Sequence, residues 1–308
     1  MNARSLAIAW FLFAAGCREP LAPSKATPRL TPQRQTIFAP PAGFTRLRLL
    51  VPPVLARETL EKAYARLDDY LARQLGVPVE LVIGESYDDV VSRTAAGDFD
   101  AVMLSPLTYA LAMERQRLPC LVQMIGDGSA TAAGYVVVRE DSPIQSVSDL
   151  PGARFGFVDR SSTSGFVYPV KLMLDSGIDP KKHLGSLEFL GNHEAVLLAL
   201  LDGRIDAGAT YQGALGALRR SRDIDPLSFR IIAKTERTPR DILCVRKELP
   251  DAVQVELRRL LLLLTVRERV GREILSPLSV NGFTPADDSA YDGVRKVAAQ
   301  VRAWDEKP

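Results

Sequence analysis

A run of hydroxyl side chains between a predicted strand and a predicted helix is the segment best suited to chemistry. Asp159 to Gly165 reads Asp-Arg-Ser-Ser-Thr-Ser-Gly and follows the predicted strand 154–158. The first N–H groups of a helix lack partners inside the helix, and the helix dipole places positive potential beside them. A helix cap needs one hydroxyl, whereas several hydroxyls and a glycine that allows close approach suit a small anion. We therefore predict anion binding, with a helix cap as the alternative, at Ser162, Thr163, Ser164 and Gly165.

The elements that would position this segment occur twice along the chain in the same order. Apolar periodicity predicts strand, helix, strand, helix and strand at 47–51, 57–75, 79–83, 87–96 and 99–104. A second series follows at 154–158, 163–176, 187–190, 193–202 and 205–210, and Pro169 is expected to distort the start of its first helix. The letters also repeat, since Gly97-Asp98-Phe99-Asp100-Ala101 corresponds to Gly203-Arg204-Ile205-Asp206-Ala207. The repeat predicts two facing α/β lobes, each with a mainly parallel sheet flanked by helices.

The repeat also predicts further side chains in a cleft between the lobes. In open parallel sheets, ligands bind beyond the carboxyl ends of the strands, near helix N-termini. Tyr87 and His193 each lie ten residues before the glycine that ends their helix, so their positions are equivalent. Ser105 and Tyr211 lie eight residues after the same glycines, where the next strands end. We expect all four to face the cleft; the alternatives are a half-buried aromatic at Tyr87 and an ordinary helix residue at His193.

Composition argues against several other classes of protein. The chain has 308 residues, 46% hydrophobic and 25% charged, which is typical of a globular protein of about two domains. A net charge of +2, with no basic run interleaved with aromatics, argues against nucleic acid as a partner. Two histidines and three scattered cysteines do not form a zinc cluster, and the common nucleotide-binding loops and the nucleophile elbow are absent. We therefore expect no metal, no cofactor and no enzymatic activity.

The N-terminus has the layout of an export signal followed by a tether. Residues 1–16 combine a basic start, an apolar stretch from Leu6 to Ala15 and small residues before Cys17. This ending is similar to the bacterial lipobox, in which the cysteine is acylated, although Ala14 replaces the usual leucine; the alternative is an ordinary cleaved signal. Residues 17–44 are rich in proline, which predicts an extended linker. We expect an exported lipoprotein, anchored to a membrane through Cys17 at the periplasmic face or the cell surface.

The other two cysteines lie in apolar segments far apart in the sequence. Cys120 is part of Leu-Pro-Cys-Leu-Val, and Cys244 is part of Ile-Leu-Cys-Val. We expect buried free thiols, with a disulfide as the alternative. The leucine run 260–264 has arginines close on both sides, which predicts a buried helix and not a membrane span.

Several short motifs occur in an order that is specific, although each motif is weak alone. Ser162-Thr163-Ser164-Gly165 is followed by Pro169, and Asn192-His193-Glu194 begins a predicted helix. The segment 104–109 reads Leu-Ser-Pro-Leu-Thr-Tyr, and 203–208 reads Gly-Arg-Ile-Asp-Ala-Gly. Over about residues 47–285 this set resembles the phosphate-, phosphite- and phosphonate-binding proteins of ABC transporters. The resemblance implies the two-lobed type II periplasmic binding protein fold, with the ligand cleft between the lobes.

The resemblance implies an extracytoplasmic solute-binding protein for a small phosphorus oxyanion: phosphite, phosphate or a short phosphonate. Such a protein closes its lobes on the ligand and delivers it to an ABC permease. We expect residues 45–137 and 238–308 to form the first lobe and 138–237 the second, with hinges near 135–140 and 231–241. The alternative is a sensor module that feeds a histidine kinase or another membrane receptor, because its fold and cleft would be the same. In either role we expect a monomer.

Carried over residue by residue, the resemblance implies the ligand contacts. The hydroxyls of Ser162, Thr163 and Ser164 would hold the oxyanion oxygens. His193 would donate a hydrogen bond from the same lobe, and Tyr87 from the other. Asp241 would accept a hydrogen bond from a protonated ligand oxygen, because a carboxylate repels a fully ionised ligand.

Three positions depart from the family pattern. Ser105 replaces a common glycine, and Pro52-Pro53 stiffens a loop that usually contains one. Gly213 stands where binders of aminoalkyl phosphonates have an acidic residue, so an amine on the ligand would lack a counter-ion. We therefore expect a small oxyanion in preference to aminoethylphosphonate; a chain that no longer binds phosphorus oxyanions is the further alternative.

Overall fold

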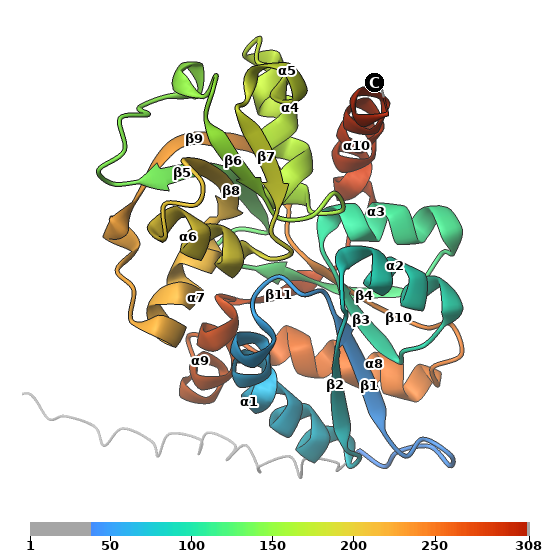
Figure 1. Ribbon diagram of the computed structural model, residues 1–308. Coiled ribbons are helices and arrows are strands. Elements are labelled where there is room, and N and C mark those ends of the chain that lie inside the picture. The colour runs from blue at the N-terminus through green and yellow to red at the C-terminus, as the bar shows by residue number, and fades with distance from the viewer. Residues whose placement is uncertain (1–37, 307–308) are drawn as a thin grey trace, which may run out of the picture. The chain divides into compact units, whose positions relative to one another are not determined.

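The computed structural model describes residues 38–306, which contain two β-sheets with helices on their faces (Figure 1). The first sheet has the strand order β11-β4-β10-β3-β1-β2, and the second has the order β7-β6-β8-β5-β9. We call the parts of the chain built on these sheets the first lobe and the second lobe. The predicted export signal, Cys17 and the linker as far as residue 37 lie outside the described residues.

The first lobe has a parallel centre and antiparallel strands beside it. β1 (Leu47–Val51) pairs in parallel with β2 (Val79–Ile83) and β3 (Ala101–Leu104). β10 (Ile242–Val245) runs antiparallel to β3 and to β4 (Cys120–Ile125), and β11 (Gly282–Pro285) runs antiparallel to β4. The helices of this lobe are α1 (Arg57–Leu75), α2 (Tyr87–Ala96), α3 (Pro106–Arg115), α8 (Asp251–Leu263) and α9 (Arg269–Leu275).

The second lobe has the same plan. β6 (Arg154–Phe157) pairs in parallel with β7 (Ser186–Phe189) and β8 (Ala207–Tyr211). β5 (Thr131–Arg139) runs antiparallel to β8 and to β9 (Phe229–Pro239). Its helices are α4 (Tyr168–Asp175), α5 (Pro180–His183), α6 (His193–Leu201) and α7 (Gln212–Arg222). The prediction of two α/β lobes is confirmed, and the sheets are mixed where mainly parallel sheets were expected, because β4, β5, β9 and β10 join antiparallel.

Equivalent residues of the internal repeat make equivalent contacts in the two lobes. Asp100 accepts a hydrogen bond from the backbone N–H of Arg48 at 2.7 Å, and Asp206 accepts one from that of Arg154 at 2.8 Å. In each lobe this aspartate therefore ties the loop before the third strand to the first strand. Gly97 and Gly203 have φ angles of 72° and 67°, a left-handed conformation that ends a helix with little strain when the residue is glycine.

The chain crosses between the sheets twice, at 126–130 and at 240–241. The predicted lobe boundaries at 137/138 and 237/238 fall inside β5 and β9, so the first crossing lies earlier in the chain than expected. A tight turn makes that crossing, with positive φ angles at Asp127 (51°) and Gly128 (71°). Arg240 links the two crossings: its backbone N–H donates to Ala130 O at 2.8 Å, and its Nε donates to Ser129 O at 3.1 Å.

The hydroxyl segment begins its helix with an unusual turn. Ser162 accepts a hydrogen bond from Gly165 N at 3.1 Å and caps the π-helical turn η2 (Thr163–Val167), which leads into α4. The backbone N–H of Val167 donates to Ser162 O at 3.1 Å, across five residues. The distortion expected from Pro169 therefore takes the form of a wider turn, which does not need the N–H group that proline lacks.

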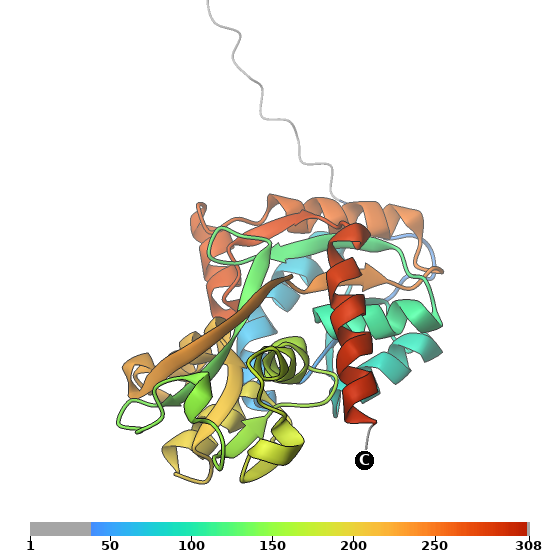
Figure 2. The same ribbon diagram turned by 90° about the horizontal axis from the view of Figure 1, so that it is seen from above.

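The last helix, α10 (Asp292–Asp305), packs against both α3 and α4 (Figure 2). Val294, Val297 and Val301 bury their side chains in the apolar cluster of the second lobe. Near the end of α10, Asp305 pairs with Arg160, and Trp304 Nε1 donates to Asp179 Oδ1 at 3.0 Å. Within residues 38–306, no helix is long and apolar enough to cross a membrane.

Candidate functional site

A cleft between the lobes collects nearly all of the predicted site residues. Its walls include Tyr87 and Ser105 from the first lobe, His193 and Tyr211 from the second, and Asp241 from a crossing. Ser162, Thr163 and Ser164 line it as well. Each of the four residues predicted from the repeat therefore faces the cleft, as expected; the contacts that they make with a ligand stay predictions.

The hydroxyls at the start of η2 are held in place by partners that leave their protons free. Ser162 Oγ accepts from Gly165 N, and Thr163 Oγ1 accepts from the backbone N–H of Leu107 in the first lobe at 2.8 Å. A hydroxyl that accepts one bond can still donate its own proton. The N–H groups of Thr163 and Ser164 are the first of their helix and have no acceptor within it. This end of the second lobe thus offers several donors at one point.

Gly165 does not belong to the cleft wall. A Cβ atom at this position would lie 2.4 Å from Val158 Cγ2, so the glycine allows η2 to pack on the end of β6. A glycine that the sequence did not single out, Gly134 on β5, lies against Ser164 instead. A Cβ there would lie 3.1 Å from Ser164 O and 3.2 Å from Ser164 Cα. Gly134 therefore lets the backbone of Ser164 lie directly against β5.

Tyr87 contributes a buried hydroxyl that has no hydrogen-bond partner in the described part of the chain. Its side chain is 1% exposed and lies at the first position of α2, after the cap formed by Ser86 Oγ and Asp89 N. Burial raises the pKa of this phenol well above its usual value, and the nearby Ser162 side chain opposes this effect only in part, so the phenol stays protonated and can donate. An unpaired buried hydroxyl costs roughly 1–3 kcal/mol, so Tyr87 offers a hydrogen-bond donor to a group bound in the cleft.

His193 occupies the equivalent position at the start of α6. Its ring is 2% exposed and packs edge-on against Tyr211, with 4.7 Å between ring centroids. Burial lowers the pKa of His193 to about 3, so the imidazole is neutral. Its Nδ1 lies 3.3 Å from Thr210 Oγ1. A neutral imidazole whose Nδ1 accepts from Thr210 carries its proton on Nε2 and can donate there.

Asp241 places a carboxylate in the cleft at the second crossing. Burial raises its pKa to about 6, and the nearby positive charge of Arg240 opposes this effect only in part. Arg240 Nε donates instead to Ser129 O at 3.1 Å, and its Nη2 lies 3.4 Å from Asp127 Oδ2. The guanidinium thus packs on the first crossing, where the missing side chain of Gly126 makes room for it. The carboxylate of Asp241 is therefore free to pair with a proton on a ligand.

Two of the departures from the family pattern have local explanations. Ser105 is 7% exposed, and its Oγ lies 2.9 Å from Thr108 Oγ1, so this hydroxyl belongs to the first turn of α3. At Gly213, a Cβ atom would lie 2.3 Å from Tyr211 Cε2. The ring of Tyr211 therefore fills the space into which a side chain at 213 would project.

Glu194, next to His193 in the chain, has a role that the sequence motif did not reveal. It is 2% exposed, on α6 of the second lobe. Its Oε2 accepts from Ala56 N at 3.3 Å and from Thr59 Oγ1 at 2.9 Å, both at the start of α1 in the first lobe. Arg222 pairs with its other oxygen at 2.8 Å. Glu194 thus caps a helix of the opposite lobe and holds the two lobes together.

Two further contacts connect the lobes beside the hydroxyl segment. Ser161 Oγ donates to Asp88 Oδ1 at 2.5 Å, and the backbone N–H of His193 donates to Val54 O at 3.1 Å. Together with the Thr163–Leu107 and Glu194 contacts, these hydrogen bonds join the two lobes beside the cleft.

The chain resembles proteins of known function across most of its length. The family model for the periplasmic substrate-binding protein of phosphonate ABC transporters matches residues 49–291. The phosphate-import protein PhnD of Mycolicibacterium smegmatis is 24% identical over 305 residues, which cover 93% of this chain and 91% of that protein.

Solved structures of type II periplasmic binding proteins share the fold. PhnD1 from Prochlorococcus marinus, in complex with methylphosphonate, has a TM-score of 0.76 at 20% identity and covers 84% of this chain and 98% of that one. A binding protein component of an ABC phosphonate transporter from Pseudomonas aeruginosa has a TM-score of 0.77 at 18% identity, over 85% and 88% of the two chains. With the family match over residues 49–291, the chain belongs to the periplasmic substrate-binding proteins of ABC phosphonate transporters, which act outside the cytoplasm and are not enzymes.

Proposed function

We propose that this chain captures a small phosphorus oxyanion (phosphite, phosphate or a short phosphonate) by closing its lobes, and delivers it to an ABC permease. The observation that carries the proposal is the Tyr87 hydroxyl, buried in the cleft wall without a partner. A ligand oxygen that accepts its proton would remove the cost of burying it. An ionised phosphoryl oxygen is a strong acceptor for such a donor.

The oxyanion lies at the start of η2 in this proposal. Two kinds of donor meet there: the backbone N–H groups of Thr163 and Ser164, and the hydroxyl protons of Ser162, Thr163 and Ser164. Tyr87 donates from the first lobe, and His193 donates from the second. Because these donors are neutral, the site binds charge through dipoles and hydrogen bonds and needs no cation.

The charge of the site selects the protonation state of the ligand. Asp241 is the acidic group of the cleft, and Arg240 points its guanidinium toward the first crossing. A ligand that keeps one proton can donate it to Asp241, whereas a fully ionised ligand meets like charge. The site therefore favours phosphorus oxyanions that carry a P–OH or an equivalent acidic proton.

The remaining cleft wall sets the size of the substituent on phosphorus. Apolar surface of the cleft comes from Leu60, Ala63, Met124 and Val280. A hydrogen or a short alkyl group fits this surface, while an amine would lose water there without gaining a counter-ion. Since the ring of Tyr211 occupies the space beside Gly213, aminoethylphosphonate is the poorer ligand of this series.

In this proposal, ligand binding favours the state in which the two lobes are closed. The contacts of Ser161, Thr163 and Glu194 with the first lobe exist only when the lobes are together. A ligand that bridges Tyr87 and Ser164 adds further contacts to that state alone and so shifts the population toward it. The crossings at 126–130 and 240–241 serve as the hinges, and the protein acts as a monomer tethered by lipid on Cys17 and the linker 17–44.

A thermal-shift panel tests the proposal. The protein, unfolded and refolded to remove bound ligand, is titrated with phosphate, phosphite, methylphosphonate and aminoethylphosphonate, with chloride as the matched salt control. We expect Tm to rise with ligand concentration, least for aminoethylphosphonate. If none of the four raises Tm above the chloride control, the oxyanion assignment is wrong.

The lipid anchor has a separate test. Metabolic labelling with a tagged fatty acid is expected to mark the full-length chain and to leave Cys17→Ala unlabelled. A labelled Cys17→Ala variant, or an unlabelled parent chain that is nevertheless exported, contradicts the anchor without touching the ligand proposal.

A further inference from the structure

Two cysteines that are 124 residues apart in the sequence lie side by side in the first lobe. Cys120 begins β4, and its register partner on the antiparallel strand β10 is Cys244. Their Sγ atoms are 2.8 Å apart, about 0.8 Å more than the roughly 2.05 Å of a disulfide bond. The ladder between β4 and β10 is irregular between Leu243 and Cys244, and this irregularity places Cys244 opposite Cys120. In regular antiparallel pairs, opposed Cα atoms are about 4.5–5.5 Å apart, inside the range that disulfides span. A bond therefore requires only a small side-chain movement.

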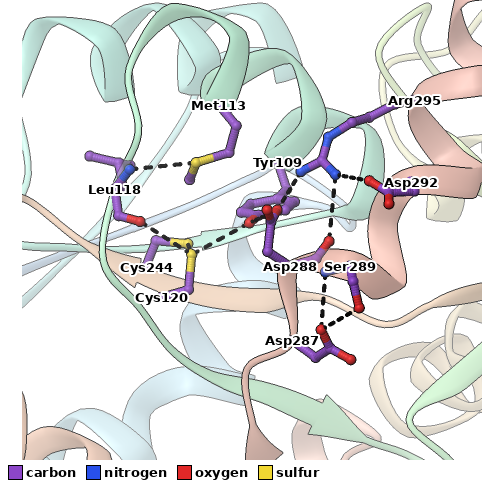
Figure 3. Close-up of polar contacts among 10 residues, drawn as sticks. All are labelled: Tyr109, Met113, Leu118, Cys120, Cys244, Asp287, Asp288, Ser289, Asp292 and Arg295. Carbon is purple, nitrogen blue, oxygen red and sulfur yellow. Dashed lines mark hydrogen bonds and ion pairs between the residues drawn. The ribbon is translucent and has the colours of Figure 1, made fainter.

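The surroundings hold the Cys120 thiol toward its partner (Figure 3). Cys120 Sγ lies 3.5 Å from Leu118 O and 3.7 Å from the Tyr109 hydroxyl. Tyr109 is itself fixed, because it donates to Asp288 Oδ1 at 2.6 Å and Asp288 pairs with Arg295. The sulfur of Cys120 thus contacts fixed groups on one side and Cys244 on the other.

The two thiols differ in access and in acidity. Cys244 is 0% exposed, whereas Cys120 is partly exposed. The hydrogen bond with Cys244 lowers the pKa of the Cys120 thiol, and burial raises the pKa of the Cys244 thiol well above its usual value. Since the thiolate is the nucleophile in disulfide exchange, Cys120 is the residue that an external oxidant meets first.

We propose that Cys120 and Cys244 are joined by a disulfide bond in the exported protein. The family acts outside the cytoplasm, where disulfides form and persist. The oxidant is the disulfide of a thiol–disulfide oxidoreductase. The Cys120 thiolate attacks one of its sulfurs and forms a mixed disulfide, and one thiolate of the oxidant leaves and is protonated. The Cys244 thiol then loses its proton and attacks Cys120 Sγ, which releases the second thiol of the oxidant. Two protein thiols are oxidised, and one disulfide is reduced to two thiols.

The bond would join the two first-lobe strands that carry the chain into and out of the crossings. β4 leads into the crossing at 126–130, and β10 follows the crossing at 240–241. The span that the bond closes contains the entire second lobe. The disulfide therefore adds a covalent link between these two paired strands and restricts the unfolded chain, which stabilises the folded state. Neither effect depends on which ligand the cleft binds.

Peptide mapping of the full-length exported protein is the direct test. Free thiols are alkylated in denaturant without reductant, and the protein is then cleaved with trypsin. We expect the peptide 118–139, which contains Cys120, to be joined to the peptide 241–246, which contains Cys244. The mass of the linked pair should be lower by two hydrogens than the sum of the two reduced peptides. Recovery of both peptides with alkylated cysteines would overturn the proposal. The mapping uses the parent chain, so it does not depend on whether a cysteine variant folds.

Single variants test the order of the two steps. Without its resolving partner, Cys244→Ser is expected to accumulate a mixed disulfide on Cys120 during export, visible as an adduct that reductant removes. Cys120→Ser is expected to show no adduct. In the parent chain, reductant is expected to lower Tm, while the double variant Cys120→Ser/Cys244→Ser has a Tm that reductant does not change. An adduct on Cys244 instead, or a parent Tm that reductant leaves unchanged, contradicts the proposal.

Discussion

The loop after the first strand has different uses in the two lobes. In the first lobe, the chain after β1 enters α1 at Ala56 and Arg57, and the start of this helix is capped by Glu194 from the opposite lobe. In the second lobe, the chain after β6 enters η2, whose cap is its own Ser162. The start of η2 therefore stays open to a ligand, while the start of α1 is used to close the cleft.

The difference shows how one repeated scaffold yields two functions. A helix N-terminus attracts any negative group, and a carboxylate from the other lobe or a ligand oxyanion can satisfy it. The equivalent residues Tyr87 and His193 also differ in their partners. Tyr87 has an unpartnered hydroxyl, whereas His193 already contacts Thr210 through Nδ1. We therefore expect the ligand to depend most on η2, next on Tyr87 and less on the closing contacts.

Removal of the hydroxyl of Ser164 is expected to have the largest effect. Ser164→Ala deletes a donor to a charged ligand, a bond worth about 1.5–3 kcal/mol, so Kd rises roughly 10- to 100-fold. Isothermal titration with methylphosphonate measures it. Ser176→Ala, at the far end of α4, is the matched control and should leave Kd unchanged. Equal affinity of Ser164→Ala and the parent chain would falsify the assignment of η2 as the oxyanion site.

Tyr87→Phe sharpens the comparison, because it should separate affinity from stability. Loss of the hydroxyl removes a ligand contact and raises Kd about 10-fold, yet it also removes an unpaired buried group. The Tm of the ligand-free protein should therefore stay the same or rise. Tyr70→Phe on α1 is the control, with no change in Kd. A lower Tm with unchanged Kd would show that Tyr87 is an ordinary core residue.

Glu194→Gln tests the closing role of the start of α1. The variant keeps the shape of the side chain but loses the charge that Ala56 N, Thr59 and Arg222 share, so closure should weaken and Kd rise about 5-fold. Glu188→Gln, on the exposed strand β7, is the control. Small-angle X-ray scattering should show a more open ligand-free protein for Glu194→Gln. Unchanged scattering and unchanged Kd contradict a closing role.

The pH dependence of stability tests Asp241, which lies between the two lobes. Burial raises its pKa from 3.8 to about 6. Between pH 4 and 6 the ligand-free folded state therefore holds a proton that the unfolded state has released, so the free energy of unfolding falls as pH rises through this window and levels off above it. Asp241→Asn should lack this part of the slope. Parallel curves for the two proteins would mean that Asp241 titrates normally.

Much of the scaffold could be predicted because its signals are local. The leucine spacing and the terminal glycines specify α1 and α2 with the bounds that the structure has. The equivalence of Tyr87 and His193 followed from their distances to Gly97 and Gly203. Helix periodicity and stop signals depend on neighbouring residues alone, which is why they can be found without a structure.

The parts that could not be predicted depend on contacts distant in the sequence. β10 joins β4 and β3 antiparallel across more than a hundred residues, and no local pattern records such a pairing. Glu194 acts on Ala56, 138 residues away. The first crossing did have a signal, the Gly-Asp-Gly turn at 126–128, which the apolar run that follows in β5 obscured.

A titration of methylphosphonate against methanesulfonate tests the central claim most directly. The two anions have nearly the same shape, but the sulfonate carries no acidic proton for Asp241 to accept and cannot form that bond. We expect methylphosphonate to bind at least about 100-fold more tightly than methanesulfonate. With methanesulfonate, the buried carboxylate of Asp241 would lose its hydrogen bond and stay unpaired. Equal or tighter binding of methanesulfonate would contradict the account of the site.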